Sequence, residues 1–153
     1  MNRSFLGFAN LLLAALVIGT TFGIWLGYDP VGLSGPAWVE QQQHAIAALN
    51  TSLPALGAAT IALTLVSAVQ ARGERRAFAL LMGAIGCFVI VALLTRLANQ
   101  PINAVVMTWP SAQPPPDWGA LRDRWWHWHE LRTAVGVGGL ALLIAGHLAA
   151  QRR

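Results

Sequence analysis

Four long apolar segments are the feature that most restricts how this chain can fold. None of them contains Asp, Glu, Lys or Arg. The hydrocarbon core of a bilayer is roughly 30 Å thick, and a helix needs about 20 apolar residues to cross it. The segments run from Phe5 to Leu26, from Leu53 to Val69, from Ala77 to Leu94 and from Thr133 to Ala150.

Backbone groups in lipid have no water to bond, so each apolar segment should be a helix that satisfies its own hydrogen bonds. We therefore predict an all-α integral membrane protein: a four-helix bundle that forms a single membrane domain over residues 1–153. Composition agrees, because 56% of the residues are hydrophobic and 10% are charged. The expected spans cover about residues 5–27, 53–70, 77–99 and 131–150.

The basic residues indicate topology. All ten are arginine, and they lie near the ends of the apolar segments. The net charge of +4 therefore suggests membrane lipid as a partner and no nucleic acid. By the positive-inside rule, both termini and the Arg72–Arg76 turn should be cytoplasmic, with residues 27–52 and 98–132 outside the bacterial inner membrane. The arginines of the expected cytoplasmic side are Arg3, Arg72, Arg75, Arg76, Arg152 and Arg153.

Glycines recur on one face of the first apolar segment. Gly19, Gly23 and Gly27 are four residues apart, a spacing that lets another helix approach closely. That helix can belong to the bundle or to a second copy in a homo-oligomer. Gly136 and Gly139 show the same pattern more weakly in the last segment.

The two long outer loops contain further helical signals. Ser34 is a suitable cap for an extra short helix over about residues 36–50. Pro101 lacks an N–H and should kink or end the third span near Gln100. Asp117 then caps a long loop-helix that precedes the last span.

The stretch DWGALRDRWWHWHELRT, residues 117–133, contains four of the seven tryptophans and two of the four histidines. On a helix its residues separate into two faces. The acids Asp123 and Glu130 share one face with His127. The opposite stripe, roughly 80° wide, collects Trp118, Arg122, Trp125, His129 and Arg132.

Two interpretations of this stripe compete. Trp and Arg favour the headgroup level of a bilayer, so the stretch can be an interfacial belt. A belt does not by itself align cations, tryptophans and one histidine on a single stripe. That alignment favours a site facing into the bundle.

Beyond this physical pattern, the sequence resembles the anthrone oxygenase family of membrane proteins. The upstream stretch WVEQQQHAIAALNTSLPALG also looks like the family's loop before its second helix. The resemblance implies a four-helix membrane fold and oxidation of polycyclic anthrones with O2. Its most specific part is carried by Pro101, Asn103, Trp109, Asp117, Trp118, Arg122, Trp125, His129 and Arg132.

The expected substrate is a small hydrophobic, aromatic molecule such as an anthrone or quinol. Loss of an acidic C–H proton gives an enolate that can pass an electron to O2 without a cofactor. His129 is suited to be the base, and Arg132 or Arg122, with Asn103, to stabilise the oxyanion. Trp109, Trp118 and Trp125 are expected to bind the rings.

A transition metal or heme is the alternative cofactor. Glu40 and His44 are four residues apart and share a face of the short helix, whereas Trp38 and Ile46 point the other way. With His129 they would form a His–His–carboxylate set. A non-enzymatic membrane subunit, or a helper protein that binds lipid, heme or metal, remains the alternative function.

Overall fold

The predicted all-α fold is confirmed. The computed structural model describes residues 3–151, and four of its helical stretches are long and apolar enough to cross a membrane. The chain is therefore an integral membrane protein. Its elements are α1 (Arg3–Gly27), η1 (Pro30–Gly32), α2 (Gly35–Leu49), α3 (Ser52–Gln70), α4 (Arg75–Leu94), η2 (Thr95–Asn99), α5 (Gln100–Val106) and α6 (Trp118–Gln151).

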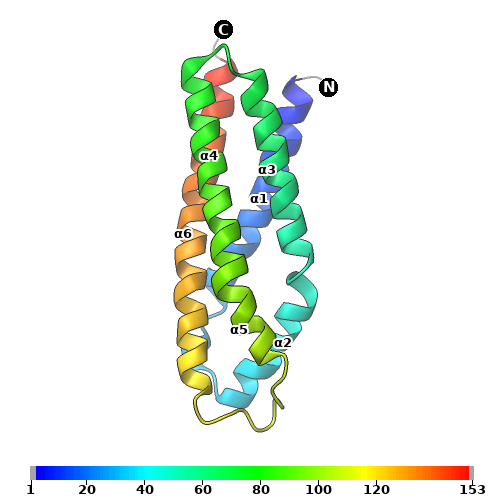
Figure 1. Cartoon of the computed structure of the whole chain (residues 1–153), viewed down its shortest axis with the longest axis vertical. Helices are drawn as coiled ribbons and strands as arrows, with labels where there is room; N and C mark the ends of the chain where they lie inside the picture. The colour runs from blue at the N-terminus through cyan, green and yellow to red at the C-terminus, as the bar shows by residue number, and fades with distance from the viewer. Residues whose placement is uncertain (1–2, 152–153) are drawn as a thin grey trace.

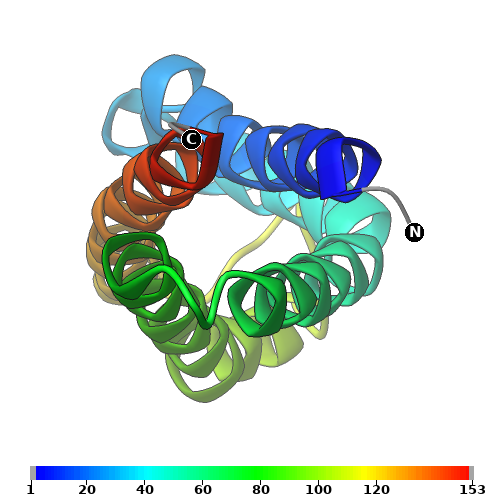
Figure 2. The same ribbon diagram turned by 90° about the horizontal axis from the view of Figure 1, so that it is seen from above.

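The four long helices form a ring. Helix α1 packs against α3 and α6, and α4 packs against the same two helices from the other side (Figure 2). The two ends of the chain and the turn between α3 and α4 lie together at one end, the termini end (Figure 1). Helices α2 and α5 and the loop before α6 lie at the other, the loop end. Of the expected cytoplasmic arginines, Arg152 and Arg153 lie outside the described residues.

Glycines of α6 allow α1 and α4 to approach closely. An added Cβ on Gly136 would lie 2.9 Å from Ile18 Cδ1 of α1, and one on Gly139 would lie 2.8 Å from Cys87 Cβ of α4. Gly146 is equally close to Leu81 of α4. Lipid tails are as apolar as leucine, so helices in a bilayer associate largely through such close contacts. The prediction for Gly136 and Gly139 is confirmed.

The glycines of α1 behave differently. Gly19, Gly23 and Gly27 are exposed, and a Cβ on any of them would meet no atom within 4 Å. Packing of this stripe inside the bundle, one of the two readings of the sequence, is therefore wrong. Helix α1 packs through a different face, which includes Ala14, Val17 and Ile18.

Pro101 does not end its helix. The backbone first widens into a π-helical turn, η2, in which the N–H of Gln100 bonds to the carbonyl of Thr95, and it then continues through α5 to Val106. A π-helical turn accommodates the hydrogen bond that proline cannot make. The third span is thus longer than expected, and its end curves over the loop end of the bundle.

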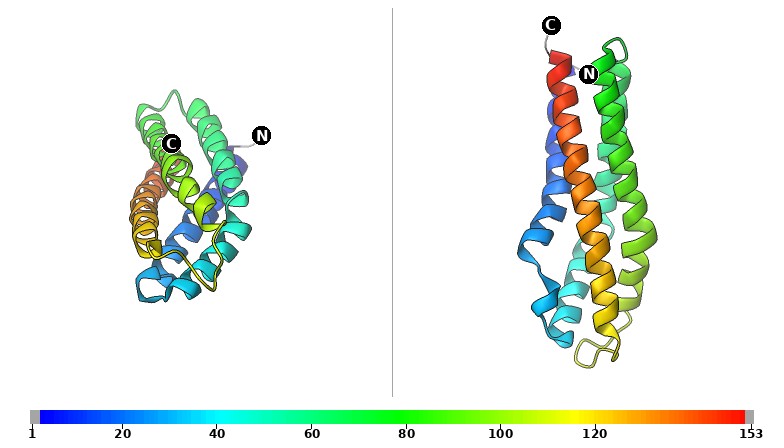
Figure 3. Two further views of the ribbon diagram at one scale, coloured as in Figure 1. Left: turned by 60° about the horizontal axis from the view of Figure 1, so that its bottom comes forward. Right: turned by 90° about the vertical axis from the view of Figure 1, so that its left-hand side faces the viewer.

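The expected loop-helix and the last span are one continuous helix. Helix α6 has 34 residues and runs the whole length of the molecule (Figure 3). No proline interrupts it, and its polar stripe turns into the bundle. The expected span over about residues 131–150 is therefore the part of α6 nearer the termini end, and the loop-helix continues into it without a break. Ser34 caps α2 as predicted, accepting a hydrogen bond from the Ala37 N–H at 3.4 Å.

Candidate functional site

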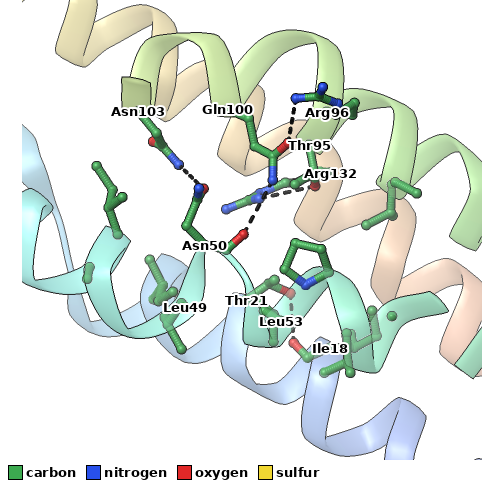
Figure 4. A pocket seen from close by; sticks show the side chains of 18 of the residues that line it. Ile18, Thr21, Leu49, Asn50, Leu53, Thr95, Arg96, Gln100, Asn103 and Arg132 are labelled. Atoms are coloured by element: carbon green, nitrogen blue, oxygen red, sulfur yellow. Dashed lines mark hydrogen bonds between the residues drawn. The ribbon is translucent and has the colours of Figure 1, made fainter. Parts of the chain in front are cut away.

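A cavity of about 480 Å³ lies inside the ring in the half nearer the loop end. Its volume falls in the range of roughly 300–1,000 Å³ typical of small-molecule pockets. Apolar side chains of α1, α3 and α4 form most of the wall, and polar groups gather toward the loop end (Figure 4). The polar lining residues are Thr21, Tyr28, Gln41, Gln42, Asn50, Thr60, Thr95, Arg96, Gln100, Asn103 and Arg132.

Arg132 is the buried cation of this cavity. It projects from α6, and only 9% of its surface is exposed. Its Nη1 donates to Thr95 Oγ1 at 3.2 Å, and its Nε and Nη2 lie 3.3 and 2.9 Å from His129 Nδ1. These partners are neutral, so they orient the guanidinium without cancelling its charge. A desolvated and uncompensated cation attracts an anion strongly.

His129 is held in one protonation state by its partners. A guanidinium can only donate and a carbonyl can only accept. Nδ1, which faces Arg132, must therefore be the unprotonated nitrogen, while Nε2 carries the proton and donates to the Thr21 carbonyl at 3.1 Å. The side chain is fully buried and does not line the cavity. His129 is thus placed to position Arg132, and it is not placed as the expected base in contact with substrate.

Trp125 joins this arrangement to the cavity. Its ring stacks on His129 with centroids 5.1 Å apart and planes 4° apart. Its Nε1 donates to Asn103 Oδ1 at 2.9 Å. Trp125 also lines the cavity.

Asn103 is the centre of an amide network that ties four segments together. Its Oδ1 accepts from Trp125 of α6 and, at 3.4 Å, from Gln42 of α2. Its Nδ2 donates to Asn50 Oδ1, between α2 and α3, at 2.9 Å (Figure 4). Tyr28 extends the network by donating to Gln42 Oε1 at 3.1 Å. Most of the hydrogen-bonding capacity of Asn103 is therefore used in holding the cavity together.

Three of the predicted site residues lie away from the cavity. Trp109 and Trp118 both pack against the fully buried Trp38, with ring centroids 6.2 and 6.0 Å apart. Arg122 lies over the Trp118 ring and pairs with Asp123 at 2.8 Å. None of the three lines the cavity. Trp38, Trp109 and Trp118, which we call the tryptophan cluster, instead close the loop end of the bundle.

The expected metal set of Glu40, His44 and His129 is not assembled. Glu40 and His44 are exposed, whereas His129 is buried with both ring nitrogens engaged. Helix α2 turns its other face inward, because Trp38 and Ile46 provide the apolar contacts. Within residues 3–151 the structure shows no group of three His, Cys, Asp or Glu that could hold a metal ion.

Sequence reasoning missed the residues that complete the cavity. Thr95 comes from the π-helical turn, and Gln42, Asn50 and Gln100 lie within or beside the stretches that resemble the family, but none of them was singled out as a site residue. Gln42 also had a physical signal. It is four residues from both Trp38 and Ile46, so it shares the apolar face that α2 was bound to bury.

The fold and the cavity define a membrane-embedded helical protein with an apolar chamber for a small molecule and a buried arginine in its wall. The chain matches the anthrone oxygenase family over residues 43–142, which cover most of the chain and include Arg132, His129, Trp125 and Asn103. It belongs to the anthrone oxygenase family, and it is accordingly an oxygenase-like membrane protein. Comparison with curated proteins and with solved structures gives no match.

Proposed function

We propose that this protein oxidises a flat, weakly acidic aromatic compound, such as an anthrone or a quinol, with O2 inside the cavity. One observation carries the proposal. Among the described residues that line the cavity, Arg96 and Arg132 are the charged ones, and both are cations in a mainly apolar wall. Such a site favours the anionic form of an apolar ligand, and the family's description supports anthrones as the ligand class.

For an anthrone the proposed chemistry balances with O2 alone. The ring CH2 loses a proton to water at the mouth of the cavity and becomes an enolate, whose oxygen bears the negative charge. The enolate carbon passes an electron to O2 and combines with it to give a peroxide anion. This anion takes a proton back from water, and the resulting hydroperoxide loses water to leave a second carbonyl. One CH2 and one O2 thus give one C=O and one H2O.

The role of the chain is to stabilise the anion. Arg132, fixed by His129 and Thr95, holds the enolate oxygen through its guanidinium. The Trp125 ring lies on the cavity wall and stacks on the substrate. Burial of the site excludes water and strengthens the attraction between Arg132 and the oxyanion. Ionisation of the substrate is thereby favoured without a histidine or carboxylate in contact with it.

The test is O2 consumption by the purified protein in lipid nanodiscs, with a panel of anthrones and quinols and a protein-free control. Arg132→Gln should lower turnover on the order of 10²–10³-fold, the usual cost of losing one oxyanion donor. Arg132→Lys should also fail, because it keeps the charge and loses the planar fork that His129 and Thr95 hold.

Arg124→Gln is the matched control, since Arg124 lies on the same helix and is exposed. If Arg132→Gln and Arg124→Gln turn over alike, Arg132 is not the anion site. Saturable binding of the same compounds with no O2 uptake under any condition would instead indicate the non-enzymatic helper.

We also propose that the loop end, with the cavity, faces outward and that both chain ends are cytoplasmic. The support is the arginine distribution together with the common position of the chain ends and the Arg72–Arg76 turn. A cysteine at the exposed Gln113, with Cys87 replaced by alanine, should react with an impermeant thiol reagent in intact cells. Labelling only after lysis means the opposite orientation.

A further inference from the structure

The cavity reaches the surface of the bundle between α3 and α4. Most lining residues are buried or half-buried, and Gln41 on α2 is one of the exposed ones. The other four exposed lining residues are Pro54 and Ala58 on α3, Ala92 on α4 and Arg96 in η2. A residue with both properties lies at a rim. Figure 1 shows the two helices separating as they run away from the turn that joins them. We call the gap framed by these four residues the lateral opening.

Small side chains keep this opening unblocked. Ala58 and Ala92 present single methyl groups, and a Cβ built on Gly57, the neighbouring lining residue, would meet no atom within 4 Å. The open space therefore continues from the rim to the backbone of α3. The buried Phe88 of α4 bounds it toward the termini end.

Hydrogen bonds bound the opening on the side of the loop end. Gln100 donates to the Asn50 carbonyl at 3.4 Å, and Arg96 donates to Gln100 Oε1 at 3.3 Å (Figure 4). Beyond this bridge the tryptophan cluster fills the end of the bundle, and its Trp38 is fully buried. At the loop end, packed side chains stand between the water phase and the cavity. Between α3 and α4, the lateral opening connects the cavity to the lipid-facing surface.

The surroundings of the opening are apolar. Leu56 precedes Ala58 by two residues, and Leu93 and Leu97 directly follow Ala92 and Arg96; these leucines are 42%, 52% and 71% exposed. In a spanning helix such residues face lipid. Arg96 adds one cation at the rim, where an arginine can reach the headgroup level with its guanidinium.

We infer that the cavity takes its ligand laterally from the bilayer, through the opening framed by Pro54, Ala58, Ala92 and Arg96. The identity of the ligand, an apolar aromatic compound with one acidic group, rests on the proposed function. Arg96 receives the acidic group at the rim, and Arg132 holds it inside. Apolar aromatic compounds partition into membranes, so their concentration is higher in the lipid beside the opening than in the water at the loop end.

Accessibility of single cysteines tests the route without requiring turnover. In a Cys87→Ala background reconstituted into phospholipid vesicles, Ala58→Cys should react with a maleimide anchored to a lipid chain. Added anthraquinone should slow that reaction in a saturable way. Leu56→Cys is the matched control, because Leu56 is lipid-exposed on the same helix and does not line the cavity. It should react at a rate that anthraquinone leaves unchanged.

Blocking variants test the route during turnover. Ala58→Phe and Ala92→Phe should lower kcat/KM on the order of tenfold and leave kcat nearly unchanged, because they slow entry and spare the chemistry. Gln41→Trp probes the other exposed lining position, which lies on α2, and should have a smaller effect than the two phenylalanine variants. Leu93→Phe is the matched control, because Leu93 is exposed beside Ala92 on α4 and does not line the cavity. It should leave kcat/KM within a factor of about two.

Three results overturn the inference: reaction of Ala58→Cys with a charged aqueous maleimide but not with the lipid-anchored one, no protection by anthraquinone, or a larger effect of Gln41→Trp than of Ala58→Phe and Ala92→Phe. Failure of the proposed function looks different. In that case no compound consumes O2, yet anthraquinone still protects Ala58→Cys and the lateral opening stands.

Discussion

Helix α4 borders two regions that use small residues in opposite ways. Toward α6 it packs against Gly139 and Gly146, whose missing side chains are replaced by Cys87, Phe88 and Leu81. Toward α3 it faces Gly57 and Ala58, where nothing takes up the space. A small residue therefore creates contact or a void according to whether the neighbouring helix closes in.

The difference explains how the site is built. The close α4–α6 packing makes a rigid wall, and Arg132 and His129 both project from it. The loose α3–α4 side provides the volume and the lateral opening. Precise placement of a charged group favours a rigid support, whereas passage of a ligand needs room.

The contrast between the α4–α6 wall and the looser α3–α4 side can be tested by mutation, and the largest loss of turnover is expected at His129 of α6. Its Nδ1 orients Arg132, so His129→Leu should lower turnover about 100-fold, comparable to losing an oriented catalytic contact. His129→Asn should recover part of that loss, because an asparagine Oδ1 can accept from Arg132 in the place of Nδ1. O2 uptake measures both variants.

Control variants separate positioning from general stability. His127→Ala, on the exposed face of α6, should be nearly silent. The thermal stability of the leucine and asparagine variants should be compared, since a purely structural role predicts parallel losses of stability and activity. Equal activity of His129→Leu and His127→Ala would show that the inward stripe of α6 has no role in turnover and would favour its interpretation as an interfacial belt.

The next effect is expected at Asn103, which bridges the rigid and the loose side. Asn103→Ala leaves the Gln42 amide, the Trp125 N–H and the Asn50 amide without their partner. A buried group without a partner costs about 1–3 kcal/mol, so unfolding should become easier by at least that amount. Denaturation in a detergent series measures the change. An unchanged midpoint would show that water replaces the lost bonds and that the network does not hold the cavity.

The features that the sequence predicts correctly are those encoded in long, regular patterns of residues. The spans and the inward stripe of α6 follow from apolar runs and helical periodicity, and Trp125, His129 and Arg132 are buried where His127 and Glu130 are exposed. The stripe alone did not show that its outer part, Trp118 and Arg122, packs at the loop end and leaves the cavity to Trp125 and Arg132.

The errors have local causes. Glu40 and His44 suggest a site and so favour an inward polar face of α2, but burial of the apolar Trp38 and Ile46 contributes more free energy and turns the other face inward. Pro101 is expected to kink or end its helix because its missing N–H is visible in sequence, and the sequence does not show that a π-helical turn lets the helix continue. The hydrogen bond from Gln100 to the Asn50 carbonyl forms only because α5 lies beside the start of α3, and this placement is a property of the folded chain that no local sequence pattern shows.

A smaller effect is expected from adding one methyl group to the close packing of α6. In Gly139→Ala the new Cβ would lie 2.8 Å from Cys87 Cβ and 2.9 Å from Phe88 Cε1. Both atoms belong to a buried helix contact, so α4 and α6 must move apart. Overpacking of this kind costs about 1–3 kcal/mol. Unfolding of the reconstituted protein should shift accordingly. A neutral result would show that the two helices are not tightly coupled.

The smallest effect is expected at Gly23, the counterpart on the outside of the bundle. A Cβ there meets no atom within 4 Å, so Gly23→Ala encounters no clash and gains helix propensity. Stability should rise by roughly 0.5–1 kcal/mol, with the same particle mass in nanodiscs or detergent as the parent chain. A loss of stability together with a smaller particle would mean that the Gly19, Gly23 and Gly27 stripe packs against a second copy. In that case α1 would contain a close-packed seam like that of α6, formed between two chains instead of within one, and the outer face of the bundle would no longer contrast with the α4–α6 wall.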